Sequence, residues 1–247
     1  MEVHHHSHSD RKKWTHYLWE FLMLFLAVTL GFLVENMREH SVEHTREKQF
    51  IQSLFNDIKA DTANITRIIN ARTTKEHSLD SLSYMMNSVS PADFAKRIYL
   101  YAAPIARTLP YRLIPNDGTM QQLKNSGGLR LIRNHKVVDS IAKYDVSIRN
   151  IVSQWAVEEN LIESYRTAAT KIFDALVFDE MLDENAGVSL PKENPALQSY
   201  SKRELYEWNY RTYGLGGINK ANRRDLRLLL KQATELLDLL KKEYHLE

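Results

Sequence analysis

The stretch WTHYLWEFLMLFLAVTLGFLV, residues 14–34, carries one formal charge, Glu20. At a rise of about 1.5 Å per residue, a helix of this length covers roughly 30 Å, the thickness of the hydrocarbon core of a bilayer. From residue 21 to residue 34 no polar stripe interrupts the apolar side chains, whereas a core helix of a soluble domain normally has one. The sequence therefore predicts a membrane-spanning helix here, at the one stretch in the chain that has this character.

The two other interpretations of this stretch are a cleaved signal peptide and a buried core helix. A signal peptide ends in small residues at its cleavage site, but this apolar run ends in GFLV at residues 31–34. Aromatic rings gather at the other end, and such rings prefer the headgroup level of a bilayer. We therefore expect a permanent anchor. Its marker residues are Trp14, Tyr17, Trp19, Glu20 and Gly31.

Glu20 is an ionisable residue inside the predicted span, and such residues are costly and suggest a function by default. One interpretation is a proton-coupled carboxylate, as in single-span partners of ion-driven motors. A second is a contact with a cation on a partner helix. The simplest is that Glu20, about two turns from the edge of the span, reaches headgroups or water.

Basic residues flank the span unevenly and predict its direction. Arg11, Lys12 and Lys13 come directly before it, whereas Arg38, Arg46 and Lys48 follow at wider spacing among acidic residues. Basic residues mark the cytoplasmic side, and acidic residues contribute little. We expect a single-pass inner-membrane protein with a cytoplasmic N-terminus and a periplasmic C-terminal domain. The absence of cysteine is compatible with an oxidising compartment.

Composition points to a helical domain without an obvious charged partner. Charged residues make up 26% of the chain and the formal net charge is +2, which gives no reason to expect nucleic acid. With 8 glycines and 6 prolines the chain has few helix breakers. We divide it into a His-rich cytoplasmic tail (1–13), a transmembrane helix (14–34), a charged helical stalk (35–49) and a helical bundle (50–247).

Apolar residues follow the stalk at spacings of three and four over residues 51–71, which is typical of an amphipathic helix. They are Ile51, Leu54, Phe55, Ile58, Ile65, Ile68 and Ile69. Thr73-Thr74 with Glu76 predicts a new helix start. Ser90-Pro91 predicts another start, in a helix that should stop before Pro104.

The second half of the chain predicts further helices. Thr119 begins a short helix that Gly127-Gly128 ends, and Asn134 can cap the next one. Residues 135–182 contain no proline or glycine, which predicts one long helix or a kinked one, and residues 183–199 are the best loop candidate.

The C-terminal part should contain two helices. Ser201 with Glu204 fits a capping box for a helix to about residue 213. Gly214, Gly216 and Gly217 should break it, and the last helix should cover residues 219–244. No credible strand occurs, and each amphipathic stripe needs a partner. The sequence therefore predicts an all-α fold, in which the transmembrane helix continues into an antiparallel helical bundle.

Several of these segments resemble a known family. They are EFLMLFLAV (20–28) followed by GF (31–32) and EN (35–36), REKQFI-x-SL (46–54), DIK-x-DT (57–62) and QLKNSGGLRLIRN (122–134). The chain resembles uncharacterised single-span membrane proteins common in Bacteroidota, which have a His-rich N-terminus and a helical outer domain. The resemblance implies the topology given above and native histidines, and it implies no activity. It does not extend beyond residue 183.

The most unusual soluble segment lies around residues 121–134. Its basic side chains, together with backbone N–H groups at the start of the next helix, form a candidate ligand or anion pocket. The alternative is a plain joint between two helices. The residues are Lys124, Gly127, Gly128, Arg130, Arg133 and Asn134.

An aromatic group with arginines further along the chain resembles a binding surface in composition. The candidate partner surface is Arg203, Tyr206, Trp208, Tyr210 and Arg211, with Tyr200 and Tyr213 nearby. Trp208 and Tyr210 equally fit residues that pack this helix onto the bundle.

Metal and catalytic signals are weak. His40-Ser41-Val42-Glu43-His44 matches the pattern of inverted zinc peptidases, but it lies in the charged stalk and no third ligand follows. His4, His5, His6 and His8 suit loose binding of Zn, Ni or Cu, or a disordered tail. Asp57 and Asp61 fit solvated acids of a helix. We predict no cofactor and no enzymatic activity.

The sequence thus predicts a membrane-anchored interaction or scaffold protein of the cell envelope. Its partners would be the lipid bilayer and either further copies of the chain or another membrane protein. The alternative is a periplasmic ligand-sensing bundle, which resembles the helical sensor domains of chemoreceptors and signals through a membrane partner. A sensor should have a cavity between helices, whereas a scaffold should have an exposed apolar patch or a symmetric interface. The class of ligand is not predicted.

Overall fold

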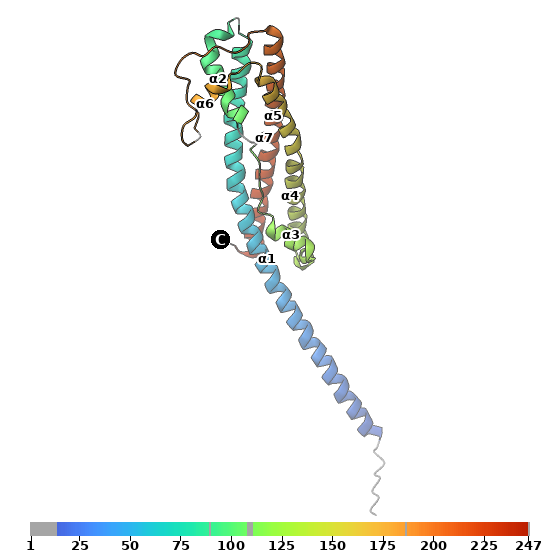
Figure 1. Cartoon of the computed structure of the whole chain (residues 1–247). Coiled ribbons are helices and arrows are strands. Elements are labelled where there is room, and N and C mark those ends of the chain that lie inside the picture. The colour runs from blue at the N-terminus through green and yellow to red at the C-terminus, as the bar shows by residue number, and fades with distance from the viewer. Residues whose placement is uncertain (1–13, 89, 108–110, 186, 247) are drawn as a thin grey trace, which may run out of the picture. The chain divides into compact units, whose positions relative to one another are not determined.

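The computed structural model describes residues 14–88, 90–107, 111–185 and 187–246 (Figure 1). Within these ranges the chain is mostly helical, and the extended pairing is limited to an isolated bridge between Leu182 and Val188. The all-α prediction is confirmed. The chain divides into two compact units, Met1–Phe50 and Ile51–Glu247.

The elements follow one another in a simple order. They are α1 (Trp14–Met86), η1 (Pro91–Phe94), α2 (Ala95–Arg107), α3 (Gly118–Asn125), η2 (Gly128–Leu131), α4 (His135–Ser153), α5 (Trp155–Ala169), α6 (Ala175–Glu180) and α7 (Lys202–Tyr244).

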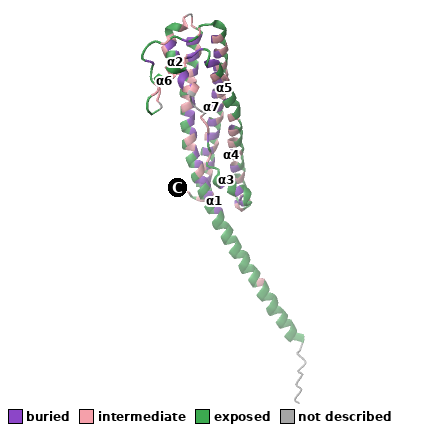
Figure 2. Cartoon of the chain, in the orientation of Figure 1, coloured by how far each residue is buried: buried purple, intermediate pink, exposed green. Residues whose placement is uncertain are grey.

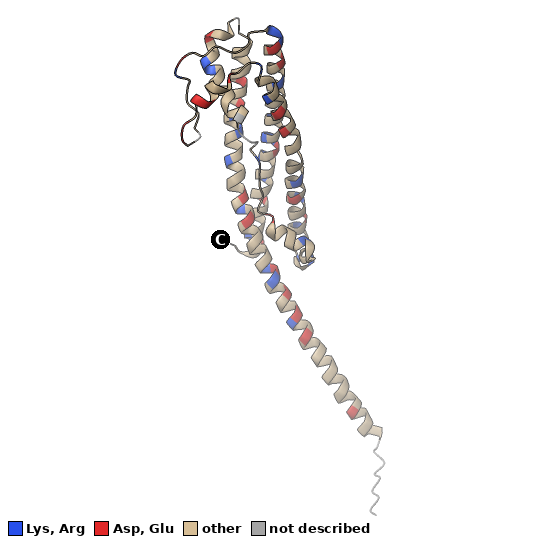
Figure 3. Ribbon diagram, viewed as in Figure 1, with Lys and Arg blue, Asp and Glu red and all other residues tan. Residues whose placement is uncertain are grey.

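The first unit contains the N-terminal part of α1. Residues 14–34 are apolar and almost all exposed (Figure 2), and this helix is long and apolar enough to cross a membrane. None of its most apolar window is buried inside the protein, which argues against the core-helix interpretation. Residues 35–49 continue as helix and carry charges of both signs (Figure 3). There the Arg38 Nε donates to Glu35 at 2.8 Å.

The second unit is built on three long helical segments: residues 51–86 of α1, α4 continued by α5, and α7 (Figure 1). Contacts between them give their directions. Asn134, before α4, donates to Glu243 near the end of α7, whereas Arg211 near the start of α7 contacts Ser164 on α5. The start of α4 therefore lies beside the end of α7, and the end of α5 lies beside the start of α7. This makes α7 antiparallel to α4 and α5.

The α1 segment of this unit runs parallel to α4 and α5. Asp61 contacts Tyr144 on α4, and Arg72, further along α1, contacts Glu158 on α5. The predicted helical bundle is therefore present, and α7 is the helix that runs antiparallel to the other long segments.

Buried positions on α1 and α7 alternate at spacings of three and four residues, the heptad spacing of helices that pack along a shared seam. On α1 these positions include Ile51, Leu54, Ile58, Asp61, Ile65, Ile68, Arg72, Lys75, Leu79 and Leu82. On α7 they are Leu205, Trp208, Thr212, Leu215, Asn219, Asn222, Leu226, Leu229, Ala233, Leu236 and Leu240. All seven apolar residues predicted to be buried over 51–71 are in the core.

An aromatic cluster fills the core where α2, α5, α6 and α7 meet. The Phe173 ring centroid lies 5.1 Å from those of both Tyr99 and Trp208. Edge-to-face contacts at such distances are favourable for aromatic rings. Trp208 is 0% exposed, so this part of α7 is fixed from inside the bundle.

The predicted helix start at Thr73-Thr74 is wrong, because α1 continues to Met86. The Thr73 hydroxyl donates to the Ile69 carbonyl at 2.9 Å, and the Thr74 hydroxyl donates to the Asn70 carbonyl at 3.3 Å. A threonine hydroxyl that bonds four residues back sits inside a helix and does not cap a new one.

The predicted stop before Pro104 is also wrong. Pro104 lies inside α2, one turn before its end at Arg107. Proline removes one helical hydrogen bond, but Ala102, Ala103 and Ile105 around it are all buried. Their packing holds this last turn in helical form.

The predicted break at the three glycines is wrong, since α7 is continuous from Lys202 to Tyr244. A glycine costs a helix only about 1 kcal/mol, and the buried seam passes unbroken through Thr212, Leu215 and Asn219. The predicted capping box at Ser201 does not form either, because the Ser201 side chain makes no capping hydrogen bond.

The long stretch 135–182 is interrupted twice. Gln154 separates α4 from α5, which agrees with the predicted kink. A second interruption at residues 170–174 ends α5, and the Asp174 side chain then caps α6 by accepting from the Leu176 N–H at 2.9 Å. Around α3 the predictions hold: Gly127 adopts φ 67°, and Asn134 caps α4 by accepting from the Lys136 N–H.

Candidate functional site

An extended segment, residues 111–117, lies along α1 and forms one wall of the site. The Arg72 guanidinium donates to the Tyr111 carbonyl at 2.8 Å. At the other end, Asp61 Oδ1 accepts from the Asn116 backbone N–H at 2.9 Å and from Asn116 Nδ2 at 2.8 Å.

The length of this segment matches the length of helix beneath it. Five extended residues cover about 16 Å at about 3.3 Å each. The helix between Asp61 and Arg72 covers about 16 Å at about 1.5 Å per residue. Arg72 and Asp61 can therefore hold both ends of the segment at the same time. The Thr119 hydroxyl, which donates to Asp57 at 2.5 Å, also attaches α3 to α1.

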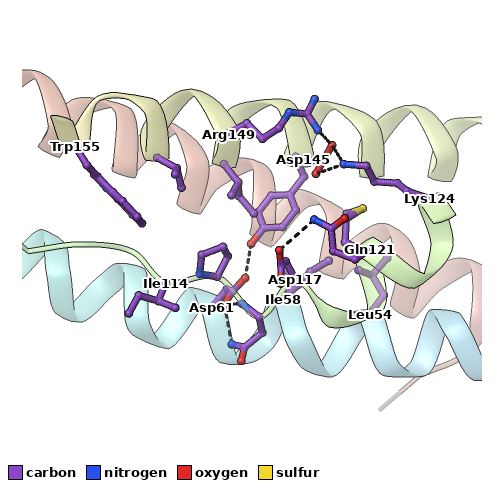
Figure 4. Close-up of a pocket in the computed structure, with 16 residues that line it drawn as sticks. Leu54, Ile58, Asp61, Ile114, Asp117, Gln121, Lys124, Asp145, Arg149 and Trp155 are labelled. Carbon is purple, nitrogen blue, oxygen red and sulfur yellow. Dashed lines mark hydrogen bonds and ion pairs between the residues drawn. The ribbon is translucent and has the colours of Figure 1, made fainter. Parts of the chain in front are cut away.

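A cavity of about 360 Å³ opens between α1, this segment, α3, α4 and α5 (Figure 4). Its lining is mostly apolar, with a few polar groups. The lining residues are Leu54, Ile58, Asp61, Ile114, Pro115, Asn116, Asp117, Met120, Gln121, Lys124, Tyr144, Asp145, Ile148, Arg149, Val152 and Trp155. This size and composition are those of small-molecule sites, which measure about 300–1,000 Å³.

Charges are distributed unevenly around the cavity. On α4, Asp145 accepts from Lys124 Nζ at 3.1 Å and also pairs with Arg149 (Figure 4). On the opposite wall, Asp61 and Asp117 make hydrogen bonds to uncharged groups, and neither has an ion pair within the part of the chain that the structure describes. Three carboxylates against two cations leave the lining with a formal charge of −1.

Asp61 is 1% exposed, so the interpretation of it as a solvated helix acid is wrong. Its Oδ2 accepts from the Tyr144 hydroxyl at 3.1 Å. Burial, and then the Asp61 charge, raise the pKa of Tyr144 far above its ordinary value. The phenol therefore keeps its proton and donates a hydrogen bond to the carboxylate. A sequence signal for this burial exists, because Asp61 occupies a position of the apolar stripe between Ile58 and Ile65.

A buried polar network joins α1, α5 and α7 beyond the cavity. Glu158 accepts from Arg72 at 2.8 and 3.0 Å, from Lys75 at 3.1 Å and from Asn222 at 2.9 Å. Asn219 Nδ2 donates to the Arg72 carbonyl at 2.9 Å. Sequence reasoning missed this network, although Arg72 and Lys75 also occupy stripe positions.

Burial and pairing act in opposite directions on the acid of this network. Burial would raise the pKa of Glu158, but the Arg72 hydrogen bond and the charges of Lys75 and Arg72 outweigh it and lower the pKa. Burial lowers the pKa of Lys75, and Glu158 opposes that change. The network therefore contains two buried cations that share one buried anion.

The predicted anion pocket around residues 124–134 is not assembled. Of its six residues only Lys124 lines the cavity, and its ammonium is paired with Asp145. Gly127 closes the turn and Asn134 caps α4, while Arg130 and Arg133 are exposed. The plain-joint alternative accounts for this segment.

The predicted partner surface separates into two parts. Trp208 is a core residue, as the packing alternative holds. Tyr206, Tyr210 and Tyr213 are 61%, 77% and 76% exposed. They line a groove on α5 and α7 of about 600 Å³ together with Leu161, Ser164, Arg203, Glu207, Arg211 and Gly214.

The stalk histidines point to local partners on α1. His40 Nδ1 lies 4.0 Å from Glu43, and His44 Nδ1 lies 3.4 Å from Glu47. Among the described residues no three His, Asp or Glu side chains are placed to hold a metal ion. The tail histidines His4, His5, His6 and His8, and the basic residues 11–13, lie outside the described residues.

The marker residues of the predicted anchor all lie on α1. Trp14, Tyr17 and Trp19 are all exposed, and a Cβ placed on Gly31 would meet nothing within 4 Å. Glu20 is likewise exposed on this helix.

Comparisons of the chain with protein-family models, with curated proteins and with solved structures find no match.

Proposed function

We propose that this chain is a membrane-anchored ligand-binding bundle, which takes up a small molecule in the cavity between α1, α3 and α4. The observation that carries the proposal is the cavity itself: about 360 Å³, mostly apolar, with a few polar groups on facing walls. Sites of this kind bury most of a small ligand and orient it through a few polar contacts.

The position of the cavity on α1 supports a sensing role. Leu54, Ile58 and Asp61 line it, and they belong to the same helix as the apolar stretch 14–34. A ligand that changes the packing of these residues acts directly on the helix that enters the membrane. A membrane partner would then carry the signal further.

A test uses two valines on α4. Val152 lines the cavity, whereas Val146 is exposed on the same helix. Val152→Trp should fill the cavity and abolish binding, and Val146→Trp should leave binding unchanged. The proposal fails if the two variants bind a mixture of aromatic amines, alcohols and carboxylates equally well.

Binding should be measured on the full chain in nanodiscs by ¹⁹F NMR of 5-fluorotryptophan. The chain has 4 tryptophans, and each reports on a different place. Trp155 lines the cavity, Trp208 is buried in the core, and Trp14 and Trp19 belong to the anchor. A shift confined to the Trp155 signal, assigned through Trp155→Phe, reports occupation of the cavity.

A second candidate function is interaction or scaffolding in the envelope, through the groove of α5 and α7. Three exposed tyrosines on one helix favour it, because aromatic residues and arginines are enriched at interfaces. Replacement of Tyr206, Tyr210 and Tyr213 by serine should remove a partner that crosslinks to the wild-type chain in native membranes. Unchanged crosslinking would rule this function out.

For topology we propose a cytoplasmic N-terminus, a periplasmic bundle and membership of the Bacteroidota family that the anchor resembles. The dense basic trio at residues 11–13 supports this direction. A phosphatase that works only in the periplasm, fused after Glu247, should be active. Activity of a cytoplasm-only reporter at the same position would reverse the topology.

A further inference from the structure

We propose that the ligand of the α1–α3–α4 cavity is an organic cation, an apolar molecule with a protonated amine. This inference rests on the proposed ligand-binding function and names the chemical class that the cavity would select. The juxtaposition that carries it is a buried carboxylate without a cationic partner, Asp61, at the wall of an apolar cavity that contains Trp155 and Tyr144.

The charge balance around the cavity favours a cation. Lys124 and Arg149 both pair with Asp145, and Arg112, which lies 5.6 Å from the centre of the Trp155 ring, pairs with Glu159. The cations near the cavity therefore already have carboxylate partners. Asp61 and Asp117 on the facing wall have none among the described residues. A buried charge without an opposite charge is costly, so a cation that enters this side is favoured.

Asp61 can accept one more hydrogen bond than it receives within the protein. A carboxylate has about four acceptor positions. Asn116 uses two of them on Oδ1, and Tyr144 uses one on Oδ2. One position on Oδ2 remains for an ammonium N–H. The Asn116 side chain is also a donor that a ligand can replace, because Asn116 is exposed and its backbone N–H holds the segment independently.

The rest of the lining suits the apolar part of such a ligand. Leu54, Ile58, Ile148 and Val152 offer aliphatic contact, and the rings of Tyr144 and Trp155 attract cations through their faces. An anionic amphiphile would instead have to displace Asp145 from both Lys124 and Arg149 against a lining of net negative charge. The chemistry therefore favours an amine over a carboxylate or an alcohol of the same shape.

The test compares three probes of one shape: 3-phenylpropylamine, 3-phenylpropanol and 3-phenylpropionate. Each is titrated at pH 7 into the full chain in phosphatidylcholine nanodiscs, with the ¹⁹F signals of 5-fluorotryptophan as readout. Trp14 and Trp19 report uptake into the bilayer, and Trp208 reports a change in the core. The amine should shift the Trp155 signal with an affinity about tenfold or more above that of the alcohol, as a charge-assisted hydrogen bond provides.

Two variants make the assignment specific. Asp61→Asn keeps the shape of the side chain and removes the charge. Its amide oxygen can still accept from Asn116, and its NH2 group can donate to the Tyr144 hydroxyl oxygen. The variant should abolish the preference for the amine. Asp139→Asn is the matched control, since Asp139 is an exposed aspartate of α4 that does not line the cavity. Its preference should be unchanged, and an unchanged Trp208 signal should show that both variants are folded.

The outcomes separate the two proposals. Binding of the alcohol or the carboxylate as tightly as the amine, or an amine preference that survives Asp61→Asn, overturns the amine class and leaves the ligand-binding function intact. If no probe shifts the Trp155 signal, the amine class is overturned. If the broader mixture then fails to distinguish Val152→Trp from Val146→Trp, the ligand-binding function is overturned as well.

Discussion

Replacing Glu158 by glutamine should be among the most destabilising single changes in the bundle. The Glu158 side chain is 0% exposed and accepts hydrogen bonds from Arg72, Lys75 and Asn222. In the Glu158→Gln variant, two buried cations lose the anion that they share. Breaking a buried ion pair by removal of one partner costs about 3–5 kcal/mol. We expect a loss of this size in the free energy of unfolding.

The assay is urea unfolding of the full chain in detergent micelles at pH 7, followed by far-UV circular dichroism. The same loss should lower the melting temperature by about 6–20 °C for a unit of this size. Glu159→Gln is the matched control. Glu159 is the next residue, it is exposed and it pairs with Arg112 at the surface. Exposed ion pairs contribute about 1 kcal/mol or less, so this control should change little.

Lys75→Met sharpens the test. It removes the second cation and leaves Arg72 and Glu158 as a balanced pair with two hydrogen bonds between them. Burial already lowers the pKa of Lys75, so its charge is unfavourable there. We expect a cost well below that of Glu158→Gln. An equal cost for the two variants, or a Glu158→Gln cost no larger than that of Glu159→Gln, would refute the reasoning.

The pH dependence follows from the direction of the Glu158 shift. The folded state lowers the pKa of Glu158 below its ordinary value, so unfolding takes up a proton as the pH falls. The stabilisation by this acid is therefore complete above about pH 5 and is lost as the pH falls through about 4 and below. Wild-type stability should fall more steeply over this range than that of Glu158→Gln. Parallel curves would contradict a charged Glu158.

Three further predictions concern packing and backbone. Trp208→Ala should cost about 3–5 kcal/mol in unfolding free energy, because it removes a buried ring, whereas Tyr210→Ala should stay within about 0.5 kcal/mol. Gly127→Ala should cost about 1–2 kcal/mol, since φ is 67° there, whereas Gly216→Ala should stabilise α7 by about 0.5–1 kcal/mol, because its Cβ meets nothing within 4 Å. Asn134→Ala should cost about 0.5–2 kcal/mol through the lost cap of α4. Urea unfolding checks all three predictions, and for the first two the contrast within the pair is the decisive result.

The sequence predicts the helices of this fold better than their ends. Apolar spacing locates α1 and α7 because burial of a stripe dominates the stability of a helix. Local end signals fail where that stripe continues. The hydroxyl of Thr73 bonds back to Ile69, and the glycines of α7 lie on a helix whose buried side is uninterrupted. Gly127, by contrast, is a correct end signal because its positive φ is required there.

The candidate site was less predictable, because it depends on contacts between distant segments. Asp61 meets Asn116 and Tyr144, which lie 55 and 83 residues further along the chain. No local pattern contains that information. A usable signal was nevertheless present, since Asp61, Arg72 and Lys75 all fall on the heptad stripe of α1. A charged residue on a stripe predicts either a break in the helix or a buried polar partner.

These buried polar groups also fix how the helices are aligned. Apolar residues at heptad spacing are nearly equivalent, so a seam built from them alone tolerates a slip of one heptad, about 10 Å along the axis. Such a slip of α1 would separate Arg72 from both Glu158 and Asn219, and it would leave Glu158 buried without either of its cations. The same Arg72 binds the Tyr111 carbonyl, and Asp61 holds Asn116 at the matching distance along α1. The alignment that satisfies the buried network is therefore also the alignment that builds the wall of the cavity. Arg72 takes part in both, because it contacts Glu158 in the core and the Tyr111 carbonyl in the wall.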